Sequence, residues 1–168
     1  MRGRNKTGRQ GQKASCILSC IWPKIATFAT EMETRHQNME SRKHLAEAKK
    51  IAGTHNCTQS VLCTYCDYTP LDEETIKQAG NCFAVGMGNM EGTCGALVGA
   101  GIVYGLAVKD KAKGVKGMRQ IMTKFQQRNG ATQCKLLKGV GTGKVLRECP
   151  LCVADASEFL EELLEETK

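Results

Sequence analysis

The clearest helical pattern of apolar residues lies at the C-terminal end of the chain. Apolar side chains recur there every three or four positions and share one side of a helix: Val153, Ala156, Phe159, Leu160, Leu163 and Leu164. Glutamates cover the other side: Glu158, Glu161, Glu162, Glu165 and Glu166. The pattern predicts an amphipathic helix that starts at Cys149-Pro150, with Cys149 at the cap position.

Two further helices are predicted in the middle of the chain. One has a periodic apolar side that ends at Asn129-Gly130, built from Val115, Met118, Ile121, Met122 and Phe125. The other is capped by Thr93 and continues to Leu106. Its first turns are made of small residues, and Gly95 and Gly99 share a face that a neighbouring backbone can approach closely.

The remaining elements are shorter. A helix from Glu40 carries Leu45, Ala48 and Ala52 on one face, and Asn56 and Thr69-Pro70 each open another. A short helix is expected over 134–137, and a flexible connection over 86–92. Because no stretch alternates as a strand does, the predicted fold class is all-α, a compact bundle of five to seven helices.

Composition divides the chain near residue 38. Residues 1–38 lack a sustained period and contain seven of the 24 Lys and Arg residues but two of the 17 Asp and Glu residues. They are expected to be a basic, disordered extension, or an incorrectly assigned start if Met39 is the true first residue. Residues 39–168 are expected to form a single helical domain. Since the basic excess lies in the extension and aromatic residues are few, no nucleic-acid-binding surface is predicted.

The N-terminal apolar run from Ala14 to Trp22 is interrupted by Pro23-Lys24, which leaves it too short to span a membrane. No transmembrane segment and a cytoplasmic location are therefore predicted. In a reducing compartment, ten cysteines serve metal binding or redox chemistry more often than structural disulfides.

Four of the cysteines coincide with predicted helix starts. Cys94 opens the glycine-rich helix, Cys57 follows Asn56, Cys149 begins the last helix, and Cys134 lies at the front of the short helix. Unpaired N–H groups and the helix dipole favour the thiolate at such positions. If these helix starts converge, four sulfur atoms share one electropositive pocket.

Two local pairs have the C-x-x-C interval, Cys63 with Cys66 and Cys149 with Cys152. The second pair is the stronger candidate, because its first sulfur begins a helix and its second lies one turn further on. The 82 residues between Cys66 and Cys149 are too many for a zinc ribbon. His55 is a possible base for Cys57, or else a residue that completes a helix cap.

The order of these features resembles a family named for its C_GCAxxG_C_C cysteine pattern. The matching segments are His55-Asn-Cys57, Phe83-Ala-Val-Gly86-Met-Gly88, Cys94-Gly-Ala-Leu-Val-Gly99-Ala100, Cys134-Lys-Leu-Leu137 and Cys149-Pro-Leu-Cys-Val153. The resemblance implies a small, mainly helical protein with four characteristic cysteines: Cys57, Cys94, Cys134 and Cys149. That family is regarded as redox-active on the strength of its cysteines. Here the stretch before Cys94 has fewer glycines than usual, and Cys63, Cys66, Cys82 and Cys152 are additional.

Three functions remain open from the sequence. In the first, the protein is a thiol–disulfide redox protein in which Cys94 attacks, Cys149 or Cys57 resolves the mixed disulfide, Cys152 is a local resolving thiol, and electrons pass to an unidentified partner protein. In the second, Cys57, Cys94, Cys134 and Cys149 hold zinc or an iron–sulfur cluster without catalysis. In the third, the cysteines are packing residues of a helical protein whose acidic last helix binds a partner.

Overall fold

The computed structural model describes residues 42–167. The predicted extension over 1–38, with Cys16 and Cys20, lies outside these residues. The all-α prediction is confirmed, because every regular element between residues 42 and 167 is helical. A helix over 42–51 is followed by α2 (Cys57–Leu62), α3 (Glu73–Ala79), α4 (Ala84–Met87), α5 (Gly95–Val108), α6 (Lys111–Asn129), α7 (Cys134–Leu137) and α8 (Cys149–Glu165).

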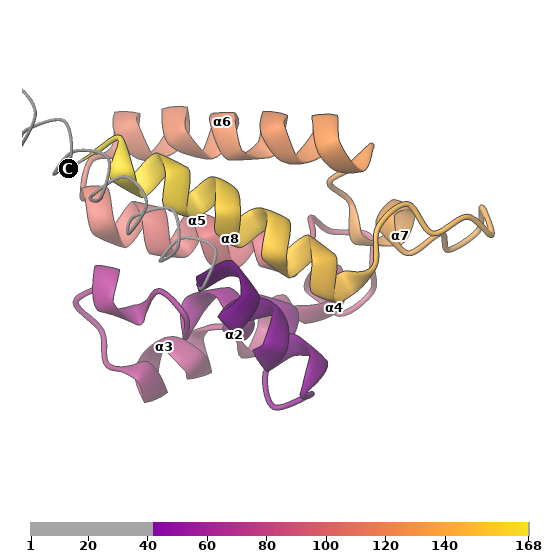
Figure 1. The fold of residues 1–168 in the computed structure, drawn as a ribbon, viewed down its shortest axis with the longest axis horizontal. Coiled ribbons are helices and arrows are strands. Elements are labelled where there is room, and N and C mark those ends of the chain that lie inside the picture. The colour runs from indigo at the N-terminus through magenta and orange to yellow at the C-terminus, as the bar shows by residue number, and fades with distance from the viewer. Residues whose placement is uncertain (1–41, 168) are drawn as a thin grey trace, which may run out of the picture. The chain divides into compact units, whose positions relative to one another are not determined.

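The core lies among the longer helices. Figure 1 shows α5 and α8 between α6 on one side and α2 and α3 on the other. The largest fully buried side chains come from several of these helices and include Leu62, Leu97, Ile121, Phe125 and Leu160. Within residues 42–167, no helix combines the length and the apolar composition needed to cross a membrane.

The glycine face of α5 brings α2 into backbone contact, as its small residues predict. A Cβ atom added at Gly99 would lie 2.8 Å from the carbonyl oxygen of Thr58 and 3.1 Å from Cβ of Val61. A side chain at this position would therefore push α2 away. The absence of side chains on this face sets the separation of the two helices.

The first described helix packs with a different face from the one predicted. Leu45 is 50% exposed, whereas Ala46 is fully buried. Polar contacts hold this helix in place: Arg42 donates to both carboxylate oxygens of Asp67 at 3.0 and 2.9 Å, and Lys43 donates to Glu158 at 3.1 Å. The apolar pattern was misleading because charged side chains, and not leucine, reach the neighbouring acidic groups.

The acidic side of α8 is also less exposed than its sequence predicts. Glu161 is only 3% exposed, and its carboxylate accepts a hydrogen bond from the Tyr65 hydroxyl at 2.9 Å. Asp155, six residues earlier, is buried in ion pairs with Arg128 at 3.1 Å and Arg147 at 2.9 Å. These carboxylates are paired with other parts of the protein, so binding a partner through a fully solvated acidic face is not supported at these positions.

Two glycines of α6 provide a matched test of the packing. A Cβ atom at Gly117 would lie 2.7 Å from Cδ2 of Leu163 and would also overlap the Tyr104 ring, whereas a Cβ atom at Gly114 would meet nothing within 4 Å. We predict that Gly117→Ala lowers the free energy of unfolding by about 1–3 kcal/mol through overpacking. Gly114→Ala should raise it by about 0.5–1 kcal/mol through helix propensity. Equal effects of the two substitutions in denaturant titrations would contradict this packing.

Candidate thiol site

Five cysteines form the candidate site and are called here the thiol cluster: Cys57, Cys94, Cys134, Cys149 and Cys152. Cys57, Cys134 and Cys149 are the first residues of α2, α7 and α8, and Cys152 lies one turn into α8. In Figure 1, α7, the start of α8 and α4 lie at the same end of the helical body. The helix starts predicted from the sequence are thus largely correct.

Three helix starts differ from the prediction. The helix expected to open at Thr69-Pro70 begins instead at Glu73, with Asp72 as its N-cap residue. Cys94, and not Thr93, is the N-cap residue of α5, and Glu148 precedes α8 as its N-cap. Thr93 forms an isolated antiparallel bridge with Gln133 instead, and the Cys94 N–H donates to the Thr132 carbonyl at 2.8 Å. This pairing holds the entry to α5 against the segment before α7, so Cys94 and Cys134 are brought close together.

Gly95 is the residue that allows Cys57 to reach α5. A Cβ atom added there would lie 2.5 Å from Sγ of Cys57 and 2.6 Å from Oγ1 of Thr58. The Cys57 sulfur therefore occupies the space where a side chain of residue 95 would be. The Cys57 sulfur lies against the start of α5 because Gly95, the residue after Cys94, has no side chain.

Cys57 and Cys149 form the first thiol pair. A hydrogen bond with Cys149 lowers the pKa of Cys57 to about 6, and backbone N–H groups at Val85 and Thr58 and the charge of Lys50 act in the same direction, against the effect of burial. The same hydrogen bond raises the pKa of Cys149. The pair therefore shares one proton, with the negative charge on Cys57. Cys57 is buried but Cys149 is partly exposed, so this pair has access to solvent.

Cys94 and Cys152 form the second pair. A hydrogen bond with Cys152 lowers the pKa of Cys94, supported by N–H groups at Ala96 and Leu97 in the first turn of α5 and opposed by burial. The pKa of Cys152 is raised by this hydrogen bond and by burial. Cys94 is 4% exposed and Cys152 is 2% exposed. This second pair is therefore enclosed within the protein.

The two pairs and Cys134 interact electrostatically. Charge on Cys94 raises the pKa of Cys134, Cys149 and Cys152, and charge on Cys57 opposes ionisation of Cys94. Burial is the main cause of the raised pKa of Cys134. The convergence expected from the sequence is thus present in the structure, with the pKa lowered at Cys57 and Cys94 and raised at the other three thiols.

Three residues around Cys57 were not identified from the sequence. Lys50 belongs to the helix over 42–51 and has no sequence signal linking it to a thiol. Val85 has a φ of 53°, which is an outlier for a β-branched residue, and its backbone N–H favours the Cys57 thiolate. The fully buried Thr58 hydroxyl makes no hydrogen bond within the described residues, so it is a donor available beside the sulfur.

The segment over 86–92, predicted to be flexible, is hydrogen-bonded and packs against α7. The Gly92 N–H donates to the Gly86 carbonyl at 3.1 Å, and the Cys134 N–H donates to the Gly92 carbonyl at 3.0 Å. A Cβ atom at Gly86 would lie 2.7 Å from Cβ of Cys134. The glycines here permit close contact around Cys134, and not free movement.

The remaining cysteines lie apart from the thiol cluster. Cys63 is the C-cap residue of α2, Cys66 begins a 3₁₀ turn (Cys66–Tyr68), and Cys82 is exposed. His55, a candidate base for Cys57, is instead grouped with Cys63 and Glu73. Lys50 is therefore the residue that supplies charge beside Cys57.

The sulfur atoms of the thiol cluster are not gathered within the ligand distances of one metal ion in this structure. A tetrahedral zinc site needs sulfur atoms about 4 Å apart, yet no three thiols among residues 42–167 have their sulfur atoms within 4.8 Å of one another. The arrangement consists of two thiol pairs and one further thiol.

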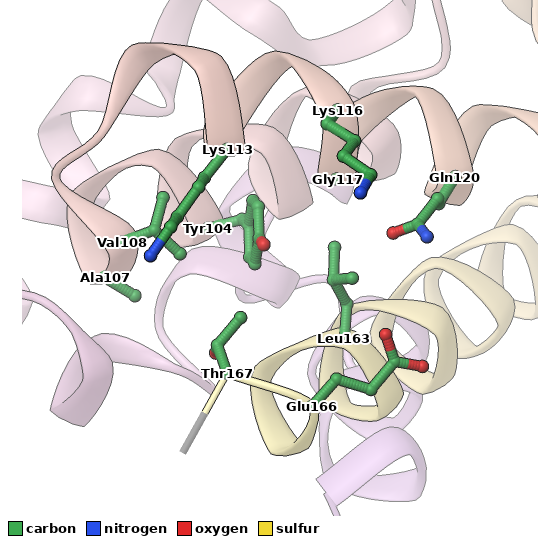
Figure 2. Close-up of a pocket in the computed structure, with 10 residues that line it drawn as sticks. All are labelled: Tyr104, Ala107, Val108, Lys113, Lys116, Gly117, Gln120, Leu163, Glu166 and Thr167. Carbon is green, nitrogen blue, oxygen red and sulfur yellow. The ribbon is translucent and has the colours of Figure 1, made fainter.

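A separate pocket of about 490 Å³ lies at the opposite ends of α5 and α8. Figure 2 shows Lys113 and Lys116 extending from α6, with Glu166 at the end of α8. No cysteine lines this pocket. Because α5 has 14 residues, its two ends are about 20 Å apart. The pocket is therefore not part of the thiol site.

Comparison with known proteins identifies the family. The family model described as "Putative redox-active protein (C_GCAxxG_C_C)" matches residues 55–163, a span that contains the whole thiol cluster. Neither the curated proteins nor the solved structures gave a match. The chain belongs to the redox-active protein family named for its C_GCAxxG_C_C cysteine pattern.

Proposed function

We propose that this protein is a thiol–disulfide redox protein that carries electrons through two dithiol pairs, Cys57 with Cys149 and Cys94 with Cys152. The observation that supports this proposal is the neighbouring thiol in each pair, which is the largest cause of the lowered pKa of Cys57 and of Cys94. Thiol–disulfide exchange requires a thiolate that attacks and a second thiol that resolves the mixed disulfide. Each pair contains both groups.

The partly exposed pair reacts with the partner, which is a protein disulfide. The Cys57 thiolate attacks one sulfur of that disulfide, so a Cys57–partner bond forms, the partner's S–S bond breaks, and the second partner sulfur leaves as a thiolate. Cys149 then gives up its proton and attacks Cys57 Sγ. A Cys57–Cys149 disulfide forms, the partner leaves as a dithiol, and two electrons have moved to the partner.

The enclosed pair then reduces the first pair. The Cys94 thiolate attacks the Cys57–Cys149 disulfide, and Cys152 resolves the resulting bond to give a Cys94–Cys152 disulfide and a reduced first pair. This step is supported by the proximity of Cys94 to the first pair: the charge of Cys57 raises the pKa of Cys94, and the charge of Cys94 raises the pKa of Cys149. In this scheme Cys94 is the attacking thiolate inside the protein, and Cys152 is its resolving thiol. The oxidised second pair is reduced again by the reverse exchange with the partly exposed first pair, whose Cys57–Cys149 disulfide is then reduced by a dithiol donor in a reducing cytoplasm.

Cys134 has a different role in this proposal. Its pKa is raised, chiefly by burial, so it remains a neutral thiol beside the two thiolates. It covers the cluster and takes no part in electron transfer. This assignment separates the redox proposal from a four-cysteine metal site, in which Cys134 would be a ligand and Cys152 would not.

The pH dependence of thiol alkylation tests the first pair. Because the pKa of Cys57 is lowered to about 6, alkylation of the reduced protein should show a phase that rises through about pH 6 and is lost in Cys57→Ser. Lys50→Gln removes a positive charge that favours the thiolate and should move this phase to higher pH, whereas Lys50→Arg should not. An alkylation profile with no phase below pH 8 would contradict the assignment.

The pairing is tested by limited oxidation and peptide mapping. The expected disulfides within the thiol cluster are Cys57–Cys149 and Cys94–Cys152, which together release four electrons. Cys152→Ser should retain the first disulfide and reduce the yield from the cluster to two electrons. A dominant Cys57–Cys94 or Cys134-containing disulfide in the wild-type protein would show that the proposed pairs are wrong.

A comparison of Cys134→Ser with Cys152→Ser distinguishes redox pairs from a metal site. Both thiols are buried, so the two substitutions are closely matched. Cys134→Ser should retain most of the exchange rate with a model protein disulfide. Cys152→Ser should reduce one partner disulfide through the first pair but not a second one, because Cys94 no longer has its resolving thiol. Metal content and free thiols are measured on the same anaerobically purified samples. A metal bound to the wild-type thiol cluster and released by Cys134→Ser, but not by Cys152→Ser, would favour the four-cysteine site instead.

A further inference from the structure

A second group of reactive side chains lies beside α2, apart from the thiol cluster. His55 precedes α2, Cys63 is the C-cap residue of α2, and Glu73 is the first residue of α3. One ligand atom from each, a nitrogen, a sulfur and an oxygen, lies within 4.8 Å of the other two. Among residues 42–167, this is the group of three His, Cys, Asp or Glu residues whose ligand atoms all lie within 4.8 Å of one another. We propose that His55, Cys63 and Glu73 bind one zinc ion.

The donor set indicates zinc. A combination of thiolate, imidazole and carboxylate is typical of zinc sites, whereas magnesium and calcium prefer oxygen ligands alone. Cys63 and Glu73 together contribute two negative charges when zinc displaces the thiol proton to solvent, so the site is neutral with the ion bound. Three protein ligands leave the fourth tetrahedral position for a water molecule.

The distances require only a small adjustment. Ligand atoms around a tetrahedral zinc ion are about 3.3–3.8 Å apart, given bond lengths of about 2.0–2.3 Å. Cys63 is buried, but the Glu73 side chain is 61% exposed. The exposed carboxylate is therefore free to move toward the other two ligands while the buried sulfur stays in place.

Thr54 is positioned to orient the histidine. Its Oγ1 lies 2.8 Å from Nδ1 of His55 and 3.4 Å from the carbonyl oxygen of Lys49. If the hydroxyl donates to that carbonyl, its oxygen accepts from the Nδ1–H group of His55, which leaves the lone pair on Nε2. Histidine ligands of metals commonly make such a hydrogen bond with the second ring nitrogen.

Two nearby lysines, Lys49 and Lys77, carry positive charge that opposes zinc, and Lys49 makes the direct contacts. Its Nζ lies 4.0 Å from a carboxylate oxygen of Glu73 and donates to the Cys63 carbonyl oxygen at 3.1 Å. The contact with Glu73 is long and exposed, so the ion pair is weak and is readily replaced by the divalent ion. Removing this positive charge should strengthen zinc binding.

Cobalt and zinc titrations test the site. The reduced full-length protein is treated with a chelator and titrated with Co²⁺, which reports thiolate ligation by a sulfur-to-metal absorption band, and Zn²⁺ is then added in competition. We expect one equivalent bound with this band, no band in Cys63→Ser, and at least about tenfold weaker binding in Glu73→Gln and Thr54→Val. Lys49→Gln should bind more tightly.

The controls separate this site from other thiols. Glu74→Gln alters the adjacent acidic residue in the same helical turn and should leave binding unchanged, as should Cys82→Ser and Cys57→Ser. Because Glu73 is exposed, Glu73→Gln remains informative even if Cys63→Ser does not fold. Absence of stoichiometric binding, or a band retained in Cys63→Ser but lost in Cys57→Ser, would overturn the proposal. Neither result depends on whether the thiol cluster carries electrons.

Discussion

The close contact between α2 and the start of α5 is the constraint on which the site depends. Gly95 and Gly99 leave no side chains between the helices, so the Cys57 sulfur and the Thr58 carbonyl lie directly against α5. The start of α2, which carries Cys57, is thereby brought to Cys94. Because α8 packs on both α2 and α5, Cys149 and Cys152 reach the same place. A side chain at Gly95 would occupy the position of the reactive sulfur itself.

Charge within the thiol cluster is limited by competition between two effects. Backbone N–H groups at helix starts favour thiolates, but burial and the repulsion between neighbouring thiolates oppose them. The result is one lowered pKa in each pair, at Cys57 and Cys94, and raised pKa values at the other three cysteines. This distribution is what the proposed sequential exchange requires, since each proposed attacking sulfur has a neighbouring thiol with a raised pKa.

The rest of the helical body keeps α8 in register with this cluster. The buried Glu161 carboxylate accepts a hydrogen bond from Tyr65, whose ring lies beneath the Arg42 guanidinium. Asp155, three residues after Cys152, is fixed by Arg128 and Arg147. Buried carboxylates with several partners of this kind specify position more than they add stability. They set the rotation and axial position of α8, and therefore the location of its two thiols.

The local sequence pattern was sufficient to predict the fold class and the approximate helix starts that carry cysteines. The periodicity of α6 and α8, the Asn56 cap and the small residues after Cys94 are properties of neighbouring residues, so the sequence alone indicated them. The same pattern was wrong for Leu45 and Glu161, because the side that a helix buries depends on what packs against it.

Tertiary structure alone decided which thiols are partners. Cys57 and Cys149 are far apart in the chain, and no spacing rule indicates their hydrogen bond or the presence of Lys50 beside them. The grouping of His55 with Cys63 and Glu73 likewise follows from how α3 folds back beside α2. The sequence determined where thiolates are favoured, because helix N-termini are local features, whereas the partners of those thiolates were decided by long-range packing.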